Sequence, residues 1–571
     1  MSTRSCDVLV IGAGAGGLAT AITAKKLGLD VIVIEKEACF GGTTAFSGGV
    51  LWVPGTRHGG NDSQAAAMTY LRNETGACFD AAGVEAFLRY APQMVEFFER
   101  ETAVKFVPTL YPDYHPQVEG GVDVGRSILA APYDIRGLGP DMARLRPPLK
   151  TITFIGMMFN SSNADLKHFF NVTRSLTSFA YVAKRLLTHL KELALYRRGT
   201  QVTSGNALAA RLVRSALDLG IPILTGTPAR QLLREGARVV GAVTEQAGSE
   251  QRIEARRGVV LACGGFSHDL QRLRQAYPHV RRGGEHFSPV PAGNTGDGAR
   301  MAEALGAKVD ICLQAPAAWM PVSKVPVGGG RHIAFPHLLD RYKPGVIGVL
   351  RSGQRFTNES NAYHDVGAAL IEACSEQAET AMWLVCDRRT LAKYGLGFAK
   401  PAPMPLGPLL RNGYLLKGQT LAELAGKAGI DAQGLEQTVR EYNLGAVHGE
   451  DRQFGRGSTS FNRYLADPQQ QPNPCVAPVG EGPYFAVKVI MGDLGTFDGL
   501  RTRVTGEVLA ADGQVIDGLY AVGNDRASIM GGNYPGAGIT LGPIMTFAYI
   551  TGRHLAGVEQ GLAAGNAREV A

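Results

Sequence analysis

Residues Cys6–Glu37 read CDVLVIGAGAGGLATAITAKKLGLDVIVIEKE, which is an apolar strand, a glycine turn, a helix-forming segment, a second apolar strand and an acidic end. Gly12, Gly14 and Gly17 match the spacing G-x-G-x-x-G. The first glycine permits a tight turn, the second lets the backbone approach a pyrophosphate at the helix N-terminus, and the third lets the helix lie close to the strand. Glu35 can accept a hydrogen bond from a ribose hydroxyl. Because strands, helix and acid are all present, the stretch predicts a dinucleotide-binding βαβ unit rather than a glycine turn made for packing alone.

The composition of the chain sets limits on its class. Its 571 residues are 45% hydrophobic, which is enough for two or more packed domains. The 58 Lys and Arg residues against 51 Asp and Glu residues give a net charge of +7, too evenly balanced for a dedicated nucleic-acid surface. The eight cysteines form no C-x-x-C pair and no His/Cys cluster at metal spacing. With no signal sequence and no bilayer-length apolar run, the chain is expected to be cytoplasmic, reduced and free of structural metal.

A second glycine-rich stretch follows the βαβ unit. Residues Phe40–Gly49 read FGGTTAFSGG, which combines glycines with three hydroxyl side chains. Glycines let such a segment wrap closely around a flat ring system, and the hydroxyl groups can donate hydrogen bonds to it. Its position directly behind the acidic strand end favours cofactor contact over a solvated loop.

Several spaced motifs carry a resemblance to a known family. They are VIGAGAGGLA, EKEACFGGTTAFSGG, ACGGF (Ala262–Phe266), GNTGDGARMAEALGA (Gly293–Ala307), GQRFTNES (Gly353–Ser360) and GLYAVGN (Gly518–Asn524). Over nearly its whole length the chain resembles the flavoprotein superfamily of fumarate reductases and 3-ketosteroid dehydrogenases, most of all the 3-ketosteroid Δ1-dehydrogenases and cyclic-ketone dehydrogenases. The resemblance implies FAD, bound noncovalently because Gly41–Gly49 has no histidine like the one that carries flavin in succinate dehydrogenases. The cofactor contacts expected are Gly12, Gly14, Gly17, Glu35, Lys36, Gly42, Thr43, Thr44, Ser47, Gly48, Ala262, Gly264, Asn294, Asp297, Gly523, Asn524, Gly538 and Leu541.

The expected fold is α/β, a Rossmann-like FAD-binding domain of the glutathione-reductase type with an inserted α+β catalytic domain. The regular alternation of strands and helices breaks down near Lys308, and the stretch 451–482 is rich in Gln, Pro, Asn and Gly, as a surface crossover would be. We therefore expect the FAD-binding domain over 1–307 and 483–571, with a helical insertion at about 151–198, and the catalytic domain over 308–482.

The insertion contains a basic amphipathic stretch. Its apolar residues recur at helical spacing, and cations lie between them. This pattern predicts a helix that either packs on its own domain or forms a lid or a peripheral membrane contact. The apolar positions are Leu176, Phe179, Ala183, Leu186, Leu190 and Leu193, and the cations are Arg174, Lys184, Arg185, Lys191, Arg197 and Arg198.

The segment Gly531–Gly542, GGNYPGAGITLG, carries the predicted chemistry. Its backbone N–H groups lie just before a helix and can point at an anion or a carbonyl. It resembles the tyrosine-proline-glycine-x-glycine motif of 3-ketosteroid dehydrogenases, which implies that the Tyr534 hydroxyl and the Gly538 N–H clamp a substrate ketone. Removing a proton next to a ketone pushes charge onto the oxygen, and two donors in place stabilise that enolate. The alternative is a glycine-rich FAD loop with a packing tyrosine.

Two departures from the family's sequence pattern limit the possible substrates and the residues that could act as the base. Tyr363 and the region of Tyr534 stand where fumarate reductases carry carboxylate-clamping arginines, so a dicarboxylate substrate is not expected. Phe356 falls where the resemblance places the proton-abstracting tyrosine of Δ1-dehydrogenases, and phenylalanine cannot take a proton. Tyr196 is the first candidate base, because the following cations Arg197 and Arg198 would stabilise its anion. The further base candidates are Tyr114 and then Tyr363 or His364, and the expected substrate-pocket residues are Trp319, Phe356 and Tyr363.

The sequence therefore predicts an FAD-dependent dehydrogenase that introduces a double bond next to a ring ketone. The substrate is a 3-ketosteroid or a cyclohexanone-type ring, and the external electron acceptor is a quinone, a carrier protein or oxygen. With no second nucleotide-binding fingerprint, NAD(P)H is not expected as partner. Two alternatives are a flavin ene-reductase working in the reverse direction and a non-catalytic flavin-binding electron-transfer subunit.

Overall fold

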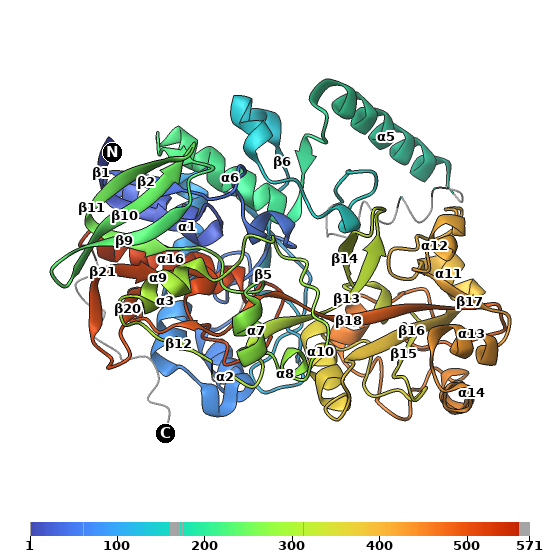
Figure 1. The fold of residues 1–571 in the computed structure, drawn as a ribbon. Helices are drawn as coiled ribbons and strands as arrows, with labels where there is room; N and C mark the ends of the chain where they lie inside the picture. Colours follow the sequence, from blue (N-terminus) through green and yellow to red (C-terminus); the bar gives the residue numbers. More distant parts are fainter. Residues whose placement is uncertain are drawn as a thin grey trace.

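The computed structural model describes residues 2–558, apart from 61, 160–167, 169–171, 173, 174 and 312. Two lobes lie side by side, each built on its own β-sheet (Figure 1). This arrangement confirms the predicted α/β fold with an inserted α+β domain.

The first sheet carries the predicted βαβ unit. Its strand order is β20-β21-β11-β1-β2-β8, and β10 and β9 extend it from β11. The central strand β1 runs parallel to β2 on one side and to β11 on the other, and its residues Val8–Ile11 pair with Val31–Ile34. The strands are β1 (Ser2–Ile11), β2 (Val31–Ile34), β8 (Ile223–Leu224), β9 (Ala229–Glu235), β10 (Arg238–Gln246), β11 (Ser249–Leu261), β20 (Glu507–Leu509) and β21 (Val515–Ala521).

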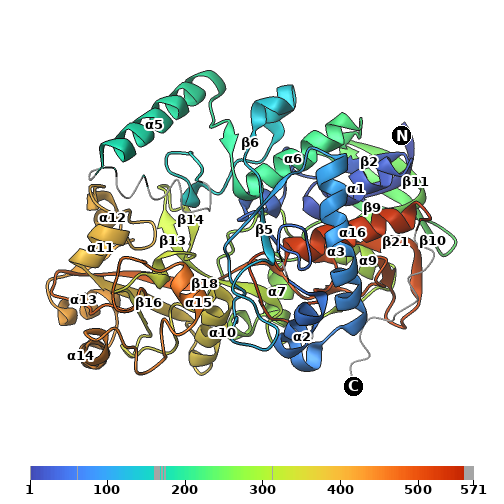
Figure 2. The ribbon, with the colours of Figure 1, turned by 180° about the vertical axis from the view of Figure 1, so that it is seen from behind.

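Helices cover this sheet because their inner faces are apolar. Helix α1 (Ala15–Lys26) is buried along nearly its whole length and packs against α16 (Leu541–Leu555), the last helix of the described chain. Helix α16 in turn packs against α3 (Ala81–Glu101) (Figure 2). The other helices of this lobe are α2 (Gln64–Thr75), α6 (Ser204–Asp218), α7 (Leu270–Ala276), α8 (Pro278–Arg281) and α9 (Asp297–Glu303).

The second sheet is antiparallel and has the order β14-β13-β18-β16-β15, with β17 paired to β18. Its long strand β18 begins just after the predicted domain boundary at 482/483, yet it pairs with β13 and β16. The second sheet therefore extends past that boundary to Thr496. Its strands are β13 (Ala317–Pro326), β14 (His332–Pro336), β15 (Ile347–Val349), β16 (Ala381–Asp387), β17 (Leu416–Gly418) and β18 (Tyr484–Thr496). Its helices are α10 (Tyr363–Ala373), α11 (Arg388–Tyr394), α12 (Gly407–Arg411), α13 (Leu421–Ala428), α14 (Ala432–Ala446) and α15 (Ser460–Tyr464).

The remaining elements are short. The small strands are β3 (Val50–Trp52), β4 (Phe106–Pro108), β5 (Ser127–Ala130), β6 (Tyr133–Asp134), β7 (Gln201–Val202), β12 (Val309–Asp310) and β19 (Gly499–Leu500). The 3₁₀ turns are η1 (Thr43–Phe46), η2 (Gly76–Cys78), η3 (Ile135–Arg144), η4 (Lys150–Ile152), η5 (Asp340–Tyr342) and η6 (Gly523–Asp525).

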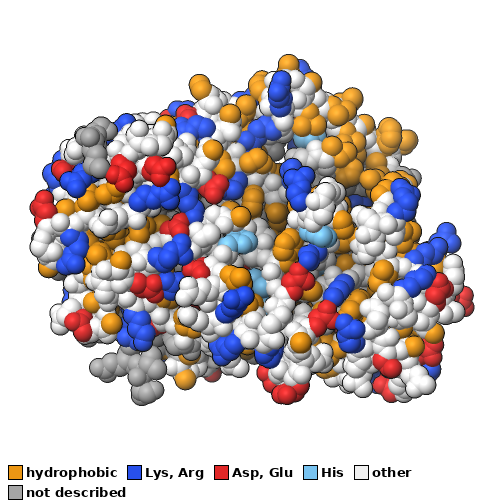
Figure 3. All heavy atoms as spheres, viewed as in Figure 1, with side chains coloured by type: hydrophobic (Ala, Val, Ile, Leu, Met, Phe, Trp, Pro, Cys, Tyr) orange, Lys and Arg blue, Asp and Glu red, His pale blue; other side chains and the backbone are white. Residues whose placement is uncertain are grey.

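The predicted amphipathic helix is present as α5 (Leu176–Tyr196), which projects from the body of the molecule (Figures 1 and 2). Much of its apolar stripe faces outward, with Leu176 87% and Phe179 59% exposed. In Figure 3 hydrophobic and basic side chains gather at this edge of the molecule. Arg174 lies outside the described residues. Within the described part of the chain, no helix has the length and hydropathy needed to cross a bilayer.

Candidate active site

Three glycines shape the turn between β1 and α1, each for a different reason. Gly12 has φ +117°, and a Cβ there would lie 2.1 Å from the Ala262 carbonyl oxygen. A Cβ on Gly17 would lie 1.9 Å from the Gly12 carbonyl oxygen, so the helix could not approach the strand. A Cβ on Gly14 would have the Thr44 Oγ1 as its nearest atom, at 4.0 Å, so the backbone is open on that side. The turn is therefore tight toward the protein and open at Gly14, as pyrophosphate binding needs.

Most of the predicted cofactor contacts line a single cleft beside the N-terminus of α1. The residues of this cleft that the sequence predicted are Gly12, Gly14, Glu35, Lys36, Gly42, Thr43, Thr44, Ala262, Gly264, Asn294, Asp297, Gly523 and Asn524. The cleft lining does not include Gly17, Ser47, Gly48, Gly538 or Leu541. It does include Arg146, Thr227, Pro228, Ala229 and Ile544, which sequence reasoning missed because no motif marks them.

The acidic residue at the end of β2 is held rigidly. The Glu35 carboxylate accepts the backbone N–H groups of Ala13 and Glu37, each at 3.0 Å. Burial raises the pKa of Glu35, and these two donors oppose the rise. On the cleft wall, Lys36 pairs with Asp297 at the start of α9. The residues present fit a dinucleotide whose pyrophosphate lies at α1 and whose ribose reaches Glu35.

Three tyrosines from distant parts of the chain form one buried cluster, here called the tyrosine cluster: Tyr114, Tyr363 and Tyr534. The rings of Tyr114 and Tyr534 stack with centroids 5.5 Å apart. Tyr363 meets both rings edge-on, at 5.8 Å from Tyr114 and 5.1 Å from Tyr534. The Tyr114 hydroxyl donates to the Tyr363 hydroxyl at 3.4 Å. Three phenols thus lie together although none is near another in the sequence.

Burial sets the protonation state of the tyrosine cluster. It raises the pKa of Tyr114 and of Tyr363 well above 10, and the neighbouring phenols add to the rise. Burial also raises the pKa of Tyr534, although hydrogen bonds with Tyr363 and Thr540 oppose the rise. All three phenols are therefore protonated in the resting protein, and one that acts as a base must first pass its proton to a neighbour.

The loop that carries Tyr534 and Gly538 is pressed against β3. Gly538 has φ +95°, and a Cβ there would lie 2.5 Å from the Val50 carbonyl oxygen and 2.6 Å from the Trp52 nitrogen. The Trp52 N–H donates to the Gly538 carbonyl at 3.0 Å. Among the described residues, the N–H of Gly538 has no acceptor. Gly538 is partly exposed, so this N–H is free to donate to a ligand oxygen.

The Pro535 carbonyl, next to Tyr534, accepts one hydrogen bond from the loop of Tyr114 and one from helix α2. The Tyr114 N–H donates to the Pro535 carbonyl at 2.8 Å, and the Tyr70 hydroxyl donates to the same carbonyl at 2.7 Å. The two tyrosine-bearing loops are therefore fixed to each other through the backbone.

His364 lies behind the tyrosine cluster. Its Nδ1 accepts the backbone N–H of Trp319 at 3.1 Å, so its Nε2 carries the proton and donates to the Gly532 carbonyl at 3.1 Å. Burial lowers the pKa of His364, which keeps the ring neutral. Both ring nitrogens are thus occupied, and His364 supports the glycine-rich loop instead of acting as a free base. Trp319 is buried against Tyr277 on the far side of this contact.

The structure does not bring Tyr196 or Phe356 to the tyrosine cluster. Tyr196 is 37% exposed at the end of α5 and lies beside Arg136. Arg198, one of the two cations that made Tyr196 the first candidate base, donates instead to main-chain carbonyls of 142 and 145. Phe356 is half-buried and packs against a different hydrophobic cluster from the one that contains Tyr363. Of the candidate bases, the structure groups Tyr114 and Tyr363 with Tyr534.

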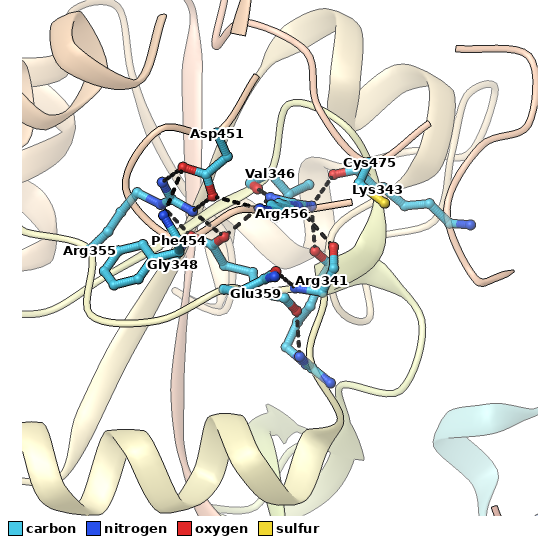
Figure 4. Close-up of polar contacts among 12 residues, drawn as sticks. Arg341, Lys343, Val346, Gly348, Arg355, Glu359, Asp451, Phe454, Arg456 and Cys475 are labelled. Carbon is cyan, nitrogen blue, oxygen red and sulfur yellow. Dashed lines mark hydrogen bonds and ion pairs between the residues drawn. The ribbon is translucent and has the colours of Figure 1, made fainter. Parts of the chain in front are cut away.

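A buried ion-pair network fixes the segment that leads into Tyr363 (Figure 4). Arg355 binds Glu359 through two hydrogen bonds of 2.7 Å and Asp451 through two of 2.8 Å. Burial alone would raise the pKa of Glu359, but the guanidinium of Arg355 lowers it below its usual range. Arg456 also donates to the Ser360 hydroxyl and to the Val346 carbonyl.

Comparisons with known proteins agree with this geometry. The model of the FAD binding domain family matches residues 7–541. The 4-oxocyclohex-2-ene-1-carboxylate 5-dehydrogenase of Sinomonas cyclohexanicum is 44% identical over 97% of this chain and 94% of that relative. The 3-oxosteroid 1-dehydrogenase of Mycobacterium tuberculosis is 36% identical over 97% of this chain and 99% of that relative.

A solved structure shares the fold. The 3-ketosteroid Δ1-dehydrogenase from Sterolibacterium denitrificans, in complex with 1,4-androstadiene-3,17-dione, is 35% identical to this chain with a TM-score of 0.89. The match covers 97% of this chain and all of that one (100%). Fold, cleft and family match together identify the cofactor as FAD. The chain therefore belongs to the family of FAD-binding flavoproteins that includes the 3-ketosteroid and cyclic-ketone dehydrogenases.

Proposed function

We propose that the protein is an FAD-dependent dehydrogenase that introduces an α,β double bond next to the ketone of a ring, in a cyclohexanone-type or 3-ketosteroid substrate. The observation that carries this proposal is the tyrosine cluster, in which the Tyr534 phenol lies in the same loop as the free N–H of Gly538. The relatives that act on a cyclohexene ketone and on 3-oxosteroids support the substrate class.

Each residue of the proposed site has a role that follows from its chemistry. The Tyr534 hydroxyl and the Gly538 N–H donate to the ketone oxygen and stabilise the enolate that forms there. Tyr363 takes the α proton, so the C–H electron pair moves into the ring as the enolate forms. The β hydrogen then leaves with its electron pair as the double bond closes. FAD held by the cleft residues would supply the hydride acceptor, and the external electron acceptor would be a quinone, a carrier protein or oxygen.

Tyr363 is proposed as the base because of its place in the tyrosine cluster. It lies between the other two phenols, and its oxygen is 3.4 Å from the Tyr114 hydroxyl, within hydrogen-bond distance. It is also the first residue of α10, and side chains tilt toward the positive N-terminal end of a helix. We therefore propose Tyr363, assisted by Tyr114, as the base instead of the sequence-based order of Tyr196, then Tyr114, then Tyr363 or His364.

Anaerobic mixing with a cyclic ketone tests the proposed function. Flavin absorbance near its visible maximum is expected to bleach with a cyclohexanone carboxylate or a 3-ketosteroid. In Tyr534→Phe the rate of bleaching should fall about 10²–10³-fold, because one of the two donors to the enolate is lost. Near-normal bleaching in this variant would contradict the assignment of Tyr534. Turnover only with a reduced dye and a conjugated ketone would favour the reverse, ene-reductase reaction.

We also propose that α5 is a peripheral membrane contact. Its exposed apolar residues share the helix with exposed Lys184 and Lys191, a pattern that suits an anionic lipid surface. The holoprotein is expected to pellet with vesicles that contain phosphatidylserine, and Phe179→Glu should reduce the bound fraction because a carboxylate replaces apolar area. Val558→Glu, on an exposed residue outside α5, is the matched control. Equal pelleting of all three proteins would contradict the membrane contact.

A further inference from the structure

His115 joins the two segments that carry Tyr114 and Tyr363. Its Nδ1 lies 2.8 Å from the Glu74 Oε2, and its Nε2 lies 2.8 Å from the Asp365 Oδ2. His115 directly follows Tyr114, and Asp365 lies in the first turn of α10, two residues after Tyr363. One imidazole therefore spans the gap between the loop of one phenol and the helix of the other.

The charge of this ring makes the bridge ionic. Burial lowers the pKa of His115, but the hydrogen bonds to Asp365 and Glu74 outweigh it and raise the pKa to about 10. At neutral pH the ring is an imidazolium with both N–H groups donating to carboxylates. Charge-assisted hydrogen bonds of this kind are short and about twice as strong as neutral ones.

The same residue is tied to the glycine-rich loop. The His115 backbone N–H donates to the Tyr70 hydroxyl at 3.3 Å, and that hydroxyl donates to the Pro535 carbonyl at 2.7 Å. His115 is thus connected to all three tyrosine-bearing segments, and among the described residues its ring nitrogens bind Glu74 and Asp365 instead of the phenols of the tyrosine cluster. Its side chain is 25% exposed, so it lies at the rim and not in the core.

We propose that His115, held between Glu74 and Asp365, is a positioning residue that sets the distance between the Tyr114 and Tyr363 hydroxyls for proton abstraction. This inference rests on the proposed function. The hydrogen bond between the two hydroxyls is 3.4 Å long, at the far end of the useful range, so a small outward shift of α10 breaks it. Misplacement of reacting groups by about 1 Å can cost as much as about 100-fold in rate.

The test compares His115→Gln and Asp365→Asn in the FAD-loaded enzyme. Both variants remove the ionic bridge and keep polar side chains. We expect flavin reduction at saturating cyclic ketone to slow about tenfold in each variant, with a smaller change in the ketone concentration that gives half-maximal rate. His448→Gln, on an exposed histidine after α14, is the matched control and should react normally.

A double variant separates positioning from a general loss of structure. If His115 acts through Tyr114, His115→Gln combined with Tyr114→Phe should be no slower than Tyr114→Phe alone. The inference would be overturned if the rate loss in the double variant equalled the product of the two single losses. Normal rates in both His115→Gln and Asp365→Asn would also overturn it. Either result would leave the proposed function intact. Failure of cyclic ketones to reduce the flavin of the unaltered enzyme would overturn the proposed function and this inference with it.

Discussion

Replacing Tyr363 by phenylalanine should slow flavin reduction by a cyclic ketone about 10²–10⁴-fold, the usual effect of losing a general base. The substitution removes only the hydroxyl, and the ring can keep its edge-on contacts with Tyr114 and Tyr534. The FAD cleft does not include residue 363, so cofactor content should not change. Stopped-flow absorbance under anaerobic conditions measures the rate directly.

Tyr196→Phe is the matched control for this variant. Tyr196 lies at the end of the projecting helix α5, away from the residues grouped around Tyr534, and the variant should reduce its flavin at the normal rate. Tyr114→Phe should show an intermediate loss, because it removes the donor to the Tyr363 oxygen but not the base. A large loss in Tyr196→Phe together with normal reduction in Tyr363→Phe would return the role of base to Tyr196.

Arg355→Met is expected to lower the free energy of unfolding by about 3–5 kcal/mol, because it leaves the buried Asp451 without a cation and Glu359 with only its 3.4 Å contact to Arg456. The side chains of Arg355, Glu359 and Asp451 are almost fully buried, so water cannot replace the lost cation. Guanidinium unfolding of the holoprotein, followed by tryptophan fluorescence, compares the variant with the unaltered protein.

Arg351→Met is the control, on an arginine four positions earlier. Arg351 is 55% exposed and pairs with Glu379, and an exposed pair contributes about 0–1 kcal/mol. If the two substitutions lowered the free energy of unfolding equally, the burial of the Arg355 ion pairs would not be what makes them stabilising.

The cofactor half of the molecule could be predicted because its determinants are local. Gly12, Gly14 and Gly17 lie within one turn, and the steric limits on a Cβ at Gly12 and Gly17 are those that the motif implies. Glu35 directly follows β2, and the end of that strand lies at the cleft, so the sequence predicts that Glu35 lines the cleft. Residues such as Thr227 reach the same cleft from a connection with no motif, and the sequence offers no signal for them.

The base could not be predicted in the same way, because its environment is made by distant segments. Tyr196 was favoured for the cations beside it in the sequence, yet Arg198 turns to main-chain carbonyls of another segment. Tyr363 ranks only third among the candidate bases in the sequence, because the phenol beside it lies 249 positions away along the chain. The second sheet likewise reaches past the predicted boundary, since the partners of β18 come from the middle of the chain.

Tyr363 begins a helix that packs on the second sheet, whereas Tyr534 lies in the loop pressed against β3, on which α16 of the first lobe packs, and the Tyr114 N–H donates to that loop. The proposed chemistry is therefore assembled between the two lobes, while the residues that line the FAD cleft all come from the first lobe. Bound flavin alone therefore does not show that a preparation is active. A change in how the two lobes pack would lower the rate of dehydrogenation while the cofactor stays bound and oxidised.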